Sequence, residues 1–217
     1  MPTISQLIVV VMALVSAGCA PEVGSVQWCK GLRVDMQKQT GARGGLMSES
    51  HLSPSRQDAI DCARLPVLNL PQVEIHLTTL QRTLRLAAEH AVSQTAREHG
   101  LQCRSQLPPG TGMLFSFEQD TRSTFWMYKT YLPLDLLYLD EGGAVVADST
   151  LPPCPRPKDA SDGQWRSLCL QQARCLQSDI PPFRHVLELP AGWLSKQGLG
   201  REQQQRLRLQ WAAPGDT

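Results

Sequence analysis

Two ionisable side chains in apolar surroundings are the candidates for acid–base chemistry in this sequence. Asp135 ends a Pro-Leu-Asp segment, with Trp126 and Lys129 upstream, and His185 begins the run His-Val-Leu-Glu-Leu. A carboxyl group among leucines often has a perturbed pKa, and it could act with His185 if folding brought the two within about 3 Å. Such a dyad would suit a hydrolase-like or small-ligand enzyme. The alternative, which we favour, is that Asp135 accepts backbone N–H bonds at the start of a strand. Trp126, Lys129 and Asp135 are also candidates for a binding surface.

The sequence lacks the motifs that accompany common catalytic and metal sites. It contains no Gly-x-Ser-x-Gly, no His-Glu-x-x-His and no glycine-rich phosphate loop. No Cys-x-x-Cys or His-Cys spacing indicates a zinc site. We therefore expect no cofactor and no metal, and we favour a binding or structural role over an enzymatic one.

The charge composition argues against a nucleic-acid partner. The 21 Lys and Arg residues nearly balance the 20 Asp and Glu residues, which leaves a net charge of +1. No basic patch with interleaved aromatic residues occurs. The composition agrees with a soluble protein of the cell envelope.

The N-terminal segment has the pattern of a secretory signal. Residues 1–18 carry no charged side chain, and Leu7 to Val15 form an unbroken apolar run followed by Ser-Ala-Gly-Cys. That run is too short to span a bilayer, which needs about 20 apolar residues, but it suits a signal peptide. The Ala-Gly-Cys end resembles a bacterial lipobox, so Cys19 is the expected lipid attachment site, with an ordinary signal peptide or a buried N-terminal strand as the alternative. Because Ala20 rather than Asp follows, we favour the outer membrane, with the chain facing the periplasm.

Three separated motifs mark the central part of the chain. Gly112 to Asp140 reads GMLFSFEQDTRSTFWMYKTYLPLDLLYLD, and His185 to Trp193 reads HVLELPAGW. Their order and spacing resemble the domain-of-unknown-function family 192, an uncharacterised bacterial and archaeal family with a GMLF-type strand, an FWM-x-x-T-x-x-PLD run and a closing LELPAG. The resemblance covers roughly Leu84 to Trp211 and implies a fold rather than an activity. Tyr128-Lys129 stands where the family more often has Lys-Asn, so a function that needs that Asn is not expected here.

The seven cysteines predict disulfides. If Cys19 carries a lipid, an even number remains, as is typical of proteins in an oxidising compartment. These six are Cys29, Cys62, Cys103, Cys154, Cys169 and Cys175.

The resemblance bears on the pairing, because the family has a Pro-Cys at the place of Cys154 and often a second Cys where Cys175 stands. A helix through Gln164 to Leu176 would separate Cys169 from Cys175 by about 9 Å along its axis and place them on different faces, so these two should not pair. The expected pairs are Cys154–Cys175 and Cys29–Cys62, with Cys169 bonded to Cys103 or left as a buried thiol.

The apolar patterns that must position these residues predict a domain that is mainly β with short helices (α+β). We expect a small, compact, barrel-like β domain with a helical insertion and an N-terminal extension. The predicted strands are Met113–Phe117, Phe125–Tyr128, Leu134–Leu139, Ala144–Ala147, His185–Leu189 and an alternating strand through Leu207, Leu209 and Trp211. The predicted helices start at Ser53-Pro54, at Ser161 or Asp162, and at Gly192-Trp193.

The stretch Leu77 to His99 allows two interpretations. Its apolar spacing suits one long helix, whereas the resemblance implies a strand near Leu84 to Ala88 and a helix near Val92 to His99 that is capped by Gly100. We favour the second.

The predicted organisation is a signal peptide (1–18), a lipid-anchored linker and small cap (19–71), a β domain (72–213) with an insertion at about 155–177, and a short tail (214–217). The expected partners are the membrane, through the lipid, and an envelope protein.

Overall fold

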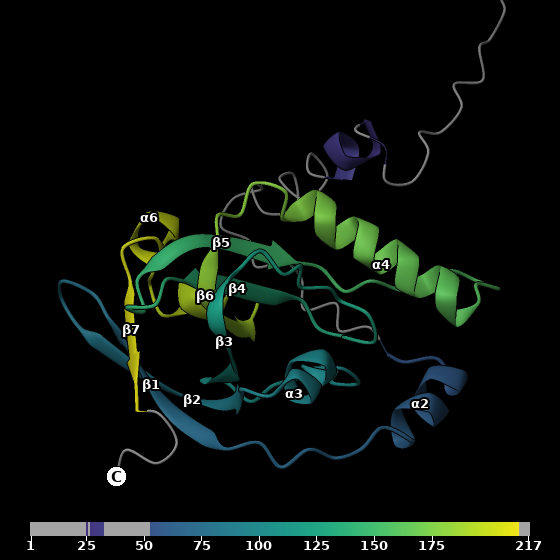
Figure 1. The fold of residues 1–217 in the computed structure, drawn as a ribbon, viewed down its shortest axis with the longest axis horizontal. Coiled ribbons are helices and arrows are strands. Elements are labelled where there is room, and N and C mark those ends of the chain that lie inside the picture. The colour runs from purple at the N-terminus through teal and green to yellow at the C-terminus, as the bar shows by residue number, and fades with distance from the viewer. Residues whose placement is uncertain (1–24, 26, 33–52, 213–217) are drawn as a thin grey trace, which may run out of the picture.

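The computed structural model describes residue 25, residues 27–32 and residues 53–212 (Figure 1). The predicted signal peptide, Cys19 and the predicted tail lie outside the described residues. The described part is dominated by a seven-stranded mixed sheet in the order β5-β4-β6-β3-β2-β1-β7. The strands are β1 (Gln72–Thr78), β2 (Thr83–Ala91), β3 (Thr111–Thr121), β4 (Leu134–Leu139), β5 (Val145–Leu151), β6 (Phe183–Pro190) and β7 (Arg208–Trp211). The pairing of β2 with β3 is parallel and the other strand pairings are antiparallel.

The sheet curls into a half-barrel because β7 returns to the turn between β4 and β5. Val145 N–H donates to the Leu207 carbonyl at 3.1 Å, and Leu209 N–H donates to the Gly143 carbonyl at 2.8 Å. Gly143 has a φ of 76°, and a Cβ placed there would lie 2.1 Å from the Leu209 carbonyl oxygen. Only glycine fits this contact, since it combines a left-handed backbone with a close approach. The predicted barrel-like fold, mainly β with short helices, is therefore confirmed.

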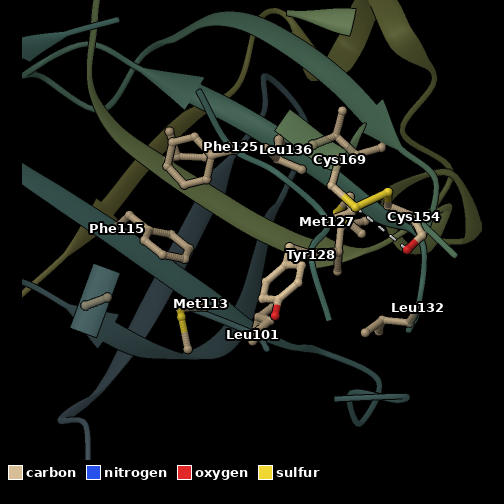
Figure 2. Packing of buried hydrophobic residues seen from close by; sticks show 14 of the residues in the cluster. Leu101, Met113, Phe115, Phe125, Met127, Tyr128, Leu132, Leu136, Cys154 and Cys169 are labelled. Carbon is tan, nitrogen blue, oxygen red and sulfur yellow. Dashed lines mark hydrogen bonds between the residues drawn. A yellow bond between two sulfur atoms is a disulfide. The ribbon is translucent and has the colours of Figure 1, made fainter. Parts of the chain in front are cut away.

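Each face of the sheet buries its own apolar core. The concave face packs leucines of six strands around Ile75, Leu114 and Leu187. The convex face of β3, β4 and β6 packs Met113, Phe115 and other side chains against helices and loops (Figure 2). Strands buried on both faces explain the nearly continuous apolar runs in the sequence.

Six helices of the described residues surround this sheet, one of which spans residues 27–32. The other five are α2 (Arg56–Ala63), α3 (Gln94–His99), α4 (Asp162–Leu176), α5 (Trp193–Lys196) and α6 (Arg201–Gln204). α4 begins with a capping box between Ser161 and Gln164 and buries Trp165, Cys169 and Ala173. The predicted inserted helix is thus confirmed, and it docks on the domain.

Most of the predicted elements are confirmed. The stretch Leu77 to His99 ends as strand β2 followed by α3, with Gly100 as the C-cap, as the favoured interpretation predicted. The helix start at Ser53 is wrong by two residues, because the Ser55 hydroxyl accepts the Asp58 N–H and caps α2.

The predicted strand Phe125–Tyr128 is wrong, since this segment is a loop across the convex face. Phe125 N–H donates to the Gln177 side-chain oxygen at 3.0 Å instead of to a strand. The Phe125 ring packs edge-on against Phe115, with ring centroids 5.0 Å apart. The aromatic residues of this segment therefore serve to cover the sheet rather than to extend it.

The disulfides differ from the expected pairs. The structure contains Cys29–Cys175, Cys62–Cys103 and Cys154–Cys169, with Cα–Cα distances of 5.2, 5.6 and 5.7 Å. The predicted pairs Cys154–Cys175 and Cys29–Cys62 are wrong, and so are both alternatives for Cys169, which does not bond to Cys103 and is not a thiol.

The reason lies in the docking of α4. Cys169 lies on the buried stripe of α4, and Figure 2 shows its disulfide with Cys154. Trp165 of the same stripe donates its indole N–H to the Cys154 carbonyl at 2.9 Å. Cys175, on another face, bonds to the segment 27–32. The expectation that Cys169 and Cys175 do not bond to each other is confirmed.

Tryptic mapping under non-reducing conditions should recover these three pairs, because Lys or Arg residues separate all six cysteines along the chain. Arg174 directly precedes Cys175, so Cys169 falls in the peptide Ser167–Arg174 and Cys175 in the next peptide. We expect Ser167–Arg174 to be linked to the peptide that contains Cys154. A link from Cys154 to the peptide that begins at Cys175 would contradict the observed docking of α4.

Candidate functional site

Asp135 and His185 do not form a dyad. On the adjacent strands β4 and β6, Asp135 is opposite Leu189, whereas His185 is opposite Leu139. The two residues are four positions apart along the strand, which is about 13 Å. The Asp135 carboxylate accepts hydrogen bonds from the Thr150 hydroxyl and from Gly192 N–H, both at 2.7 Å. The favoured alternative for Asp135 is thereby confirmed: it accepts a backbone N–H at the start of β4, and burial raises its pKa despite these two donors.

Asp135→Asn should lower the free energy of unfolding by about 1–3 kcal/mol, since an amide cannot accept both hydrogen bonds and also places an NH₂ group against a donor. Urea unfolding of wild type and variant measures the loss. A matched Thr150→Val variant removes only the hydroxyl donor and should cost less. An Asp135→Asn protein as stable as wild type would show that the two bonds contribute nothing.

Of the residues predicted to form a binding surface, Trp126, Lys129 and Asp135, Lys129 is buried and engaged with two helices. Lys129 is only 8% exposed, and its Nζ lies 3.8 Å from Asp61 Oδ2 of α2 and 4.0 Å from Asp162 Oδ1 of α4. It therefore joins the two helices to the loop beneath them. Trp126 stacks on Tyr128 with ring centroids 5.3 Å apart.

His185 instead belongs to a cluster with Ser116 and His90. His185 Nδ1 and His90 Nε2 each lie 2.8 Å from Ser116 Oγ. Burial, the Arg184 charge and His90 lower the pKa of His185 to about 4, so its imidazole is neutral at pH 7. The Trp211 ring covers it edge-on, with ring centroids 4.9 Å apart. Among the described residues no carboxylate hydrogen-bonds to either histidine, so Ser116 has no complete triad.

A cavity lies on the convex face of the sheet, between α3 and the loop that contains Phe125. Its volume is about 290 Å³, close to the lower end of typical ligand sites. Its apolar lining is Leu101, Phe115, Phe117, Phe125 and Trp126, and its polar lining is Gln94, Arg97, Glu98, His99, Gln102, Ser123, Thr124, Thr130 and Glu188.

Glu188 is the unusual member of this lining. It lies on β6 between Met113 of β3 and Leu136 of β4 and is 6% exposed. No hydrogen bond or ion pair of its carboxyl group occurs among the described residues, and burial alone raises its pKa to about 8. The carboxyl group is therefore mostly protonated at pH 7. A buried acid that faces a cavity without a partner is a candidate functional group with a physical basis.

The backbone around Glu188 requires a glycine on the next strand. A Cβ at Gly112 would lie 2.3 Å from the Glu188 carbonyl oxygen and 2.9 Å from Leu189 Cδ2. β3 and β6 thus approach closely where Glu188 enters the cavity, which positions this side chain on a rigid strand.

Glu188 is not among the site residues predicted from the sequence, although the sequence contains a signal for it. In the run Val186-Leu187-Glu188-Leu189 the two-residue period of a strand places Glu188 on the same face as Val186. A lone acidic residue on an apolar strand face, in the same domain as a GMLFSF strand and an FWM run, indicates a buried carboxyl group.

The described residues contain no group of three or more His, Cys, Asp or Glu side chains placed to hold a metal ion. None of their helices combines the length and the apolar character that crossing a membrane requires.

One family model matches this chain, and several solved structures match it as well, including the two that follow. The sequence model of the family DUF192, described as an uncharacterized ACR, matches residues 75–207. A crystal structure of a proposed transcription regulator from Sinorhizobium meliloti 1021 is 28% identical, with a TM-score of 0.51, and the match covers 67% of this chain and 98% of that one. A protein of unknown function from Novosphingobium aromaticivorans DSM 12444 is 19% identical, with a TM-score of 0.48 and coverage of 77% and 99%. No curated protein matches the chain.

Proposed function

The chain belongs to the domain-of-unknown-function family 192, and from this premise we propose that its β domain is a binding module that holds a small organic molecule in the Glu188 cavity. The observation that carries the proposal is the buried carboxyl group of Glu188, which has no partner among the described residues and lines an aromatic cavity. Ligand sites typically combine a mainly apolar wall with a few polar groups that set the orientation of the ligand. The Glu188 cavity has this composition.

The energetic cost of Glu188 supports a role in binding. A polar group buried without a hydrogen bond costs about 1–3 kcal/mol in proteins, and an apolar residue would avoid this cost. Residues that reduce stability while lining a cavity are typical of sites where function has been selected over stability. A ligand that bonds to the carboxyl group would offset the cost.

The walls of the cavity supply the remaining contacts. Phe115 and Phe125 meet edge-on and offer ring surface from a strand and from a loop. Thr130 is buried beside them, and Gln94 and Gln102 lie in the same lining. An aromatic or aliphatic ring with one polar substituent would match this arrangement.

Fragment binding observed by NMR tests the proposal. A set of single-ring compounds that spans cations, neutral molecules and anions should include binders that shift the signals of Leu101, Phe115 and Thr130. The same binders should lose at least about tenfold in affinity with Glu188→Leu. Asp135→Asn is the matched control, because this acid lies on the neighbouring strand outside the cavity, and it should bind normally. Binders that shift signals elsewhere, or that ignore Glu188→Leu, would refute the proposal.

We further propose that this module is a lipoprotein of the bacterial envelope, attached through Cys19 and facing the periplasm, with the outer membrane favoured. Cys19 lies outside the described residues. The proposal is supported by the disulfides, which use the six other cysteines and are typical of oxidising compartments. The three acyl chains of a mature lipoprotein should anchor it firmly, since a single chain anchors only marginally. Membrane fractionation of wild type and Cys19→Ala decides it: a variant that is retained in the membrane like wild type would exclude the anchor.

A further inference from the structure

We propose that the ligand of the Glu188 cavity is a small organic cation, whose ammonium group forms an ion pair with Glu188 while its apolar part contacts Phe115 and Phe125. This inference rests on the proposed binding function and specifies the chemical class of the ligand. It follows from the charges and ring faces that surround the cavity.

The carboxyl group of Glu188 faces few other charges. From α3, the cavity lining contains Arg97, Glu98 and His99; β3 contributes only phenylalanines, and residues 123–130 contribute none that ionise. From β4, Tyr138 is the ionisable neighbour, and burial raises its own pKa above its ordinary value. Burial alone accounts for the raised pKa of Glu188, so no cation of the described residues compensates its charge. A cationic ligand would supply the missing counter-charge.

The arginine of the cavity lining, Arg97, is already engaged elsewhere. Arg97 Nη1 donates to the Ser116 carbonyl at 3.0 Å and also donates to the Val92 carbonyl. Its guanidinium carbon lies 4.9 Å from the centroid of the Phe117 ring. The aromatic wall therefore already accepts a positive charge against one ring face, and its other phenylalanines can do the same for a ligand.

A cation also gains more from this site than a neutral or anionic ligand of the same shape. A neutral ligand forms at most a hydrogen bond with the protonated carboxyl group, whereas an ammonium group forms a charge-assisted bond, which is roughly twice as strong. An anion can accept a hydrogen bond from the protonated carboxyl group, but it forms no ion pair with Glu188, and Glu188 supplies no counter-charge that would offset the cost of removing the anion from water. The low polarity of the cavity increases the difference between the three ligands.

Binding of an ammonium ligand should release a proton from Glu188, which binding of a neutral ligand should not do. With a pKa of about 8, the carboxyl group is about nine-tenths protonated at pH 7 before binding. An ammonium ligand that enters with its charge converts the carboxyl group to a carboxylate, and the proton passes to the buffer. Binding should therefore release about one proton at pH 7, and affinity should rise about tenfold per pH unit below the pKa of the free site.

Calorimetry with three matched probes tests the inference. Benzylammonium, benzyl alcohol and benzoate share one ring and differ in charge. Titrations at pH 7 in phosphate and in Tris, which differ in ionisation enthalpy, count the protons released. We expect benzylammonium to bind at least about tenfold more tightly than benzyl alcohol and to release close to one proton. Glu188→Gln should abolish the proton release and the preference for the cation, and Asp135→Asn should retain both.

The outcomes separate this inference from the binding function itself. If benzyl alcohol or benzoate binds at least as tightly as benzylammonium, or if no proton is released, the cation assignment is wrong while cavity binding stands. A Glu188→Gln protein that keeps the preference also overturns it. If none of the three probes binds, the cation assignment fails, and the fragment experiment with Glu188→Leu decides the binding function separately.

Discussion

Glu188→Leu should raise the free energy of unfolding by about 1–3 kcal/mol at pH 5, and by more at pH 7, while it removes ligand binding. The leucine has a similar volume, fills the site on β6, and needs neither a hydrogen bond nor a counter-charge. Replacement of an unsatisfied buried polar group by an apolar group of the same shape is neutral to stabilising. A gain in stability that accompanies a loss of binding would mark Glu188 as a residue kept for function.

The stability difference between Glu188→Leu and wild type should also depend on pH, which provides a second test of the direction of the effect. The pKa of Glu188 is about 8 in the folded protein and close to 4.5 in the unfolded chain, so the folded protein binds more protons between these values. Wild type therefore loses stability as the pH rises from about 5 to 8, by roughly 3–5 kcal/mol, since each pH unit of difference in pKa corresponds to about 1.4 kcal/mol. Glu188→Leu lacks this component, so its advantage over wild type should grow across that window.

Urea unfolding at pH 5, 7 and 8.5 measures both effects in one experiment. His185, whose pKa is lowered, weakens the fold as the pH falls below its unfolded pKa of about 6.5, but it does so equally in wild type and variant and cancels in the difference. Glu188→Gln keeps the shape and the polarity without the ionisation, and should show the flatter pH dependence with a smaller gain. A Glu188→Leu protein that is less stable than wild type at pH 8.5 would show that the carboxyl group has a partner in solution.

Removal of the Cys154–Cys169 disulfide should lower the free energy of unfolding by about 3 kcal/mol. The bond closes a segment with a sequence separation of 15, and a loop of that length constrains the unfolded chain by about this amount. Both sulfurs lie in the convex-face core beneath α4 (Figure 2), where the Trp165 indole also bonds to the Cys154 carbonyl. The double variant Cys154→Ala with Cys169→Ala therefore tests both the cross-link and the packing of α4.

The single variant Cys154→Ala is the matched control for this experiment. It leaves Cys169 as a buried thiol and removes the same cross-link, so its stability should fall close to that of the double variant. Thermal and urea unfolding without reductant give the comparison. If the double variant is as stable as wild type, Cys154 and Cys169 are not bonded to each other in the folded protein.

The strands and helices were largely determined by local sequence patterns. The apolar runs of β3, β4 and β6, the alternation through β7 and the serine that caps α4 each specify an element from a few neighbouring residues. This works because secondary structure depends on turn residues, caps and periodicity that lie within one segment. The three motifs also sufficed to identify the family.

The tertiary structure alone decided which of these residues act together. The strand register separates Asp135 from His185, and the docking of α4 brings Cys169 rather than Cys175 to Cys154. In the same way, Phe125 and its neighbours became a cover for the sheet rather than a strand, because a side chain of the α4 C-cap bonds to their backbone. Contacts between segments that are far apart in the chain follow from packing, and no local pattern encodes them.

Glu188 illustrates both contributions, because the sequence determines one of its properties and the tertiary structure determines another. The two-residue period of β6 determines which face of the sheet carries its carboxyl group. Whether that carboxyl group is solvated depends on α3 and on residues 123–130, which cover the face from elsewhere in the chain. The carboxyl group loses its water only when these segments pack over it. The pKa of Glu188 is therefore raised only in the folded domain, and the candidate site exists only there.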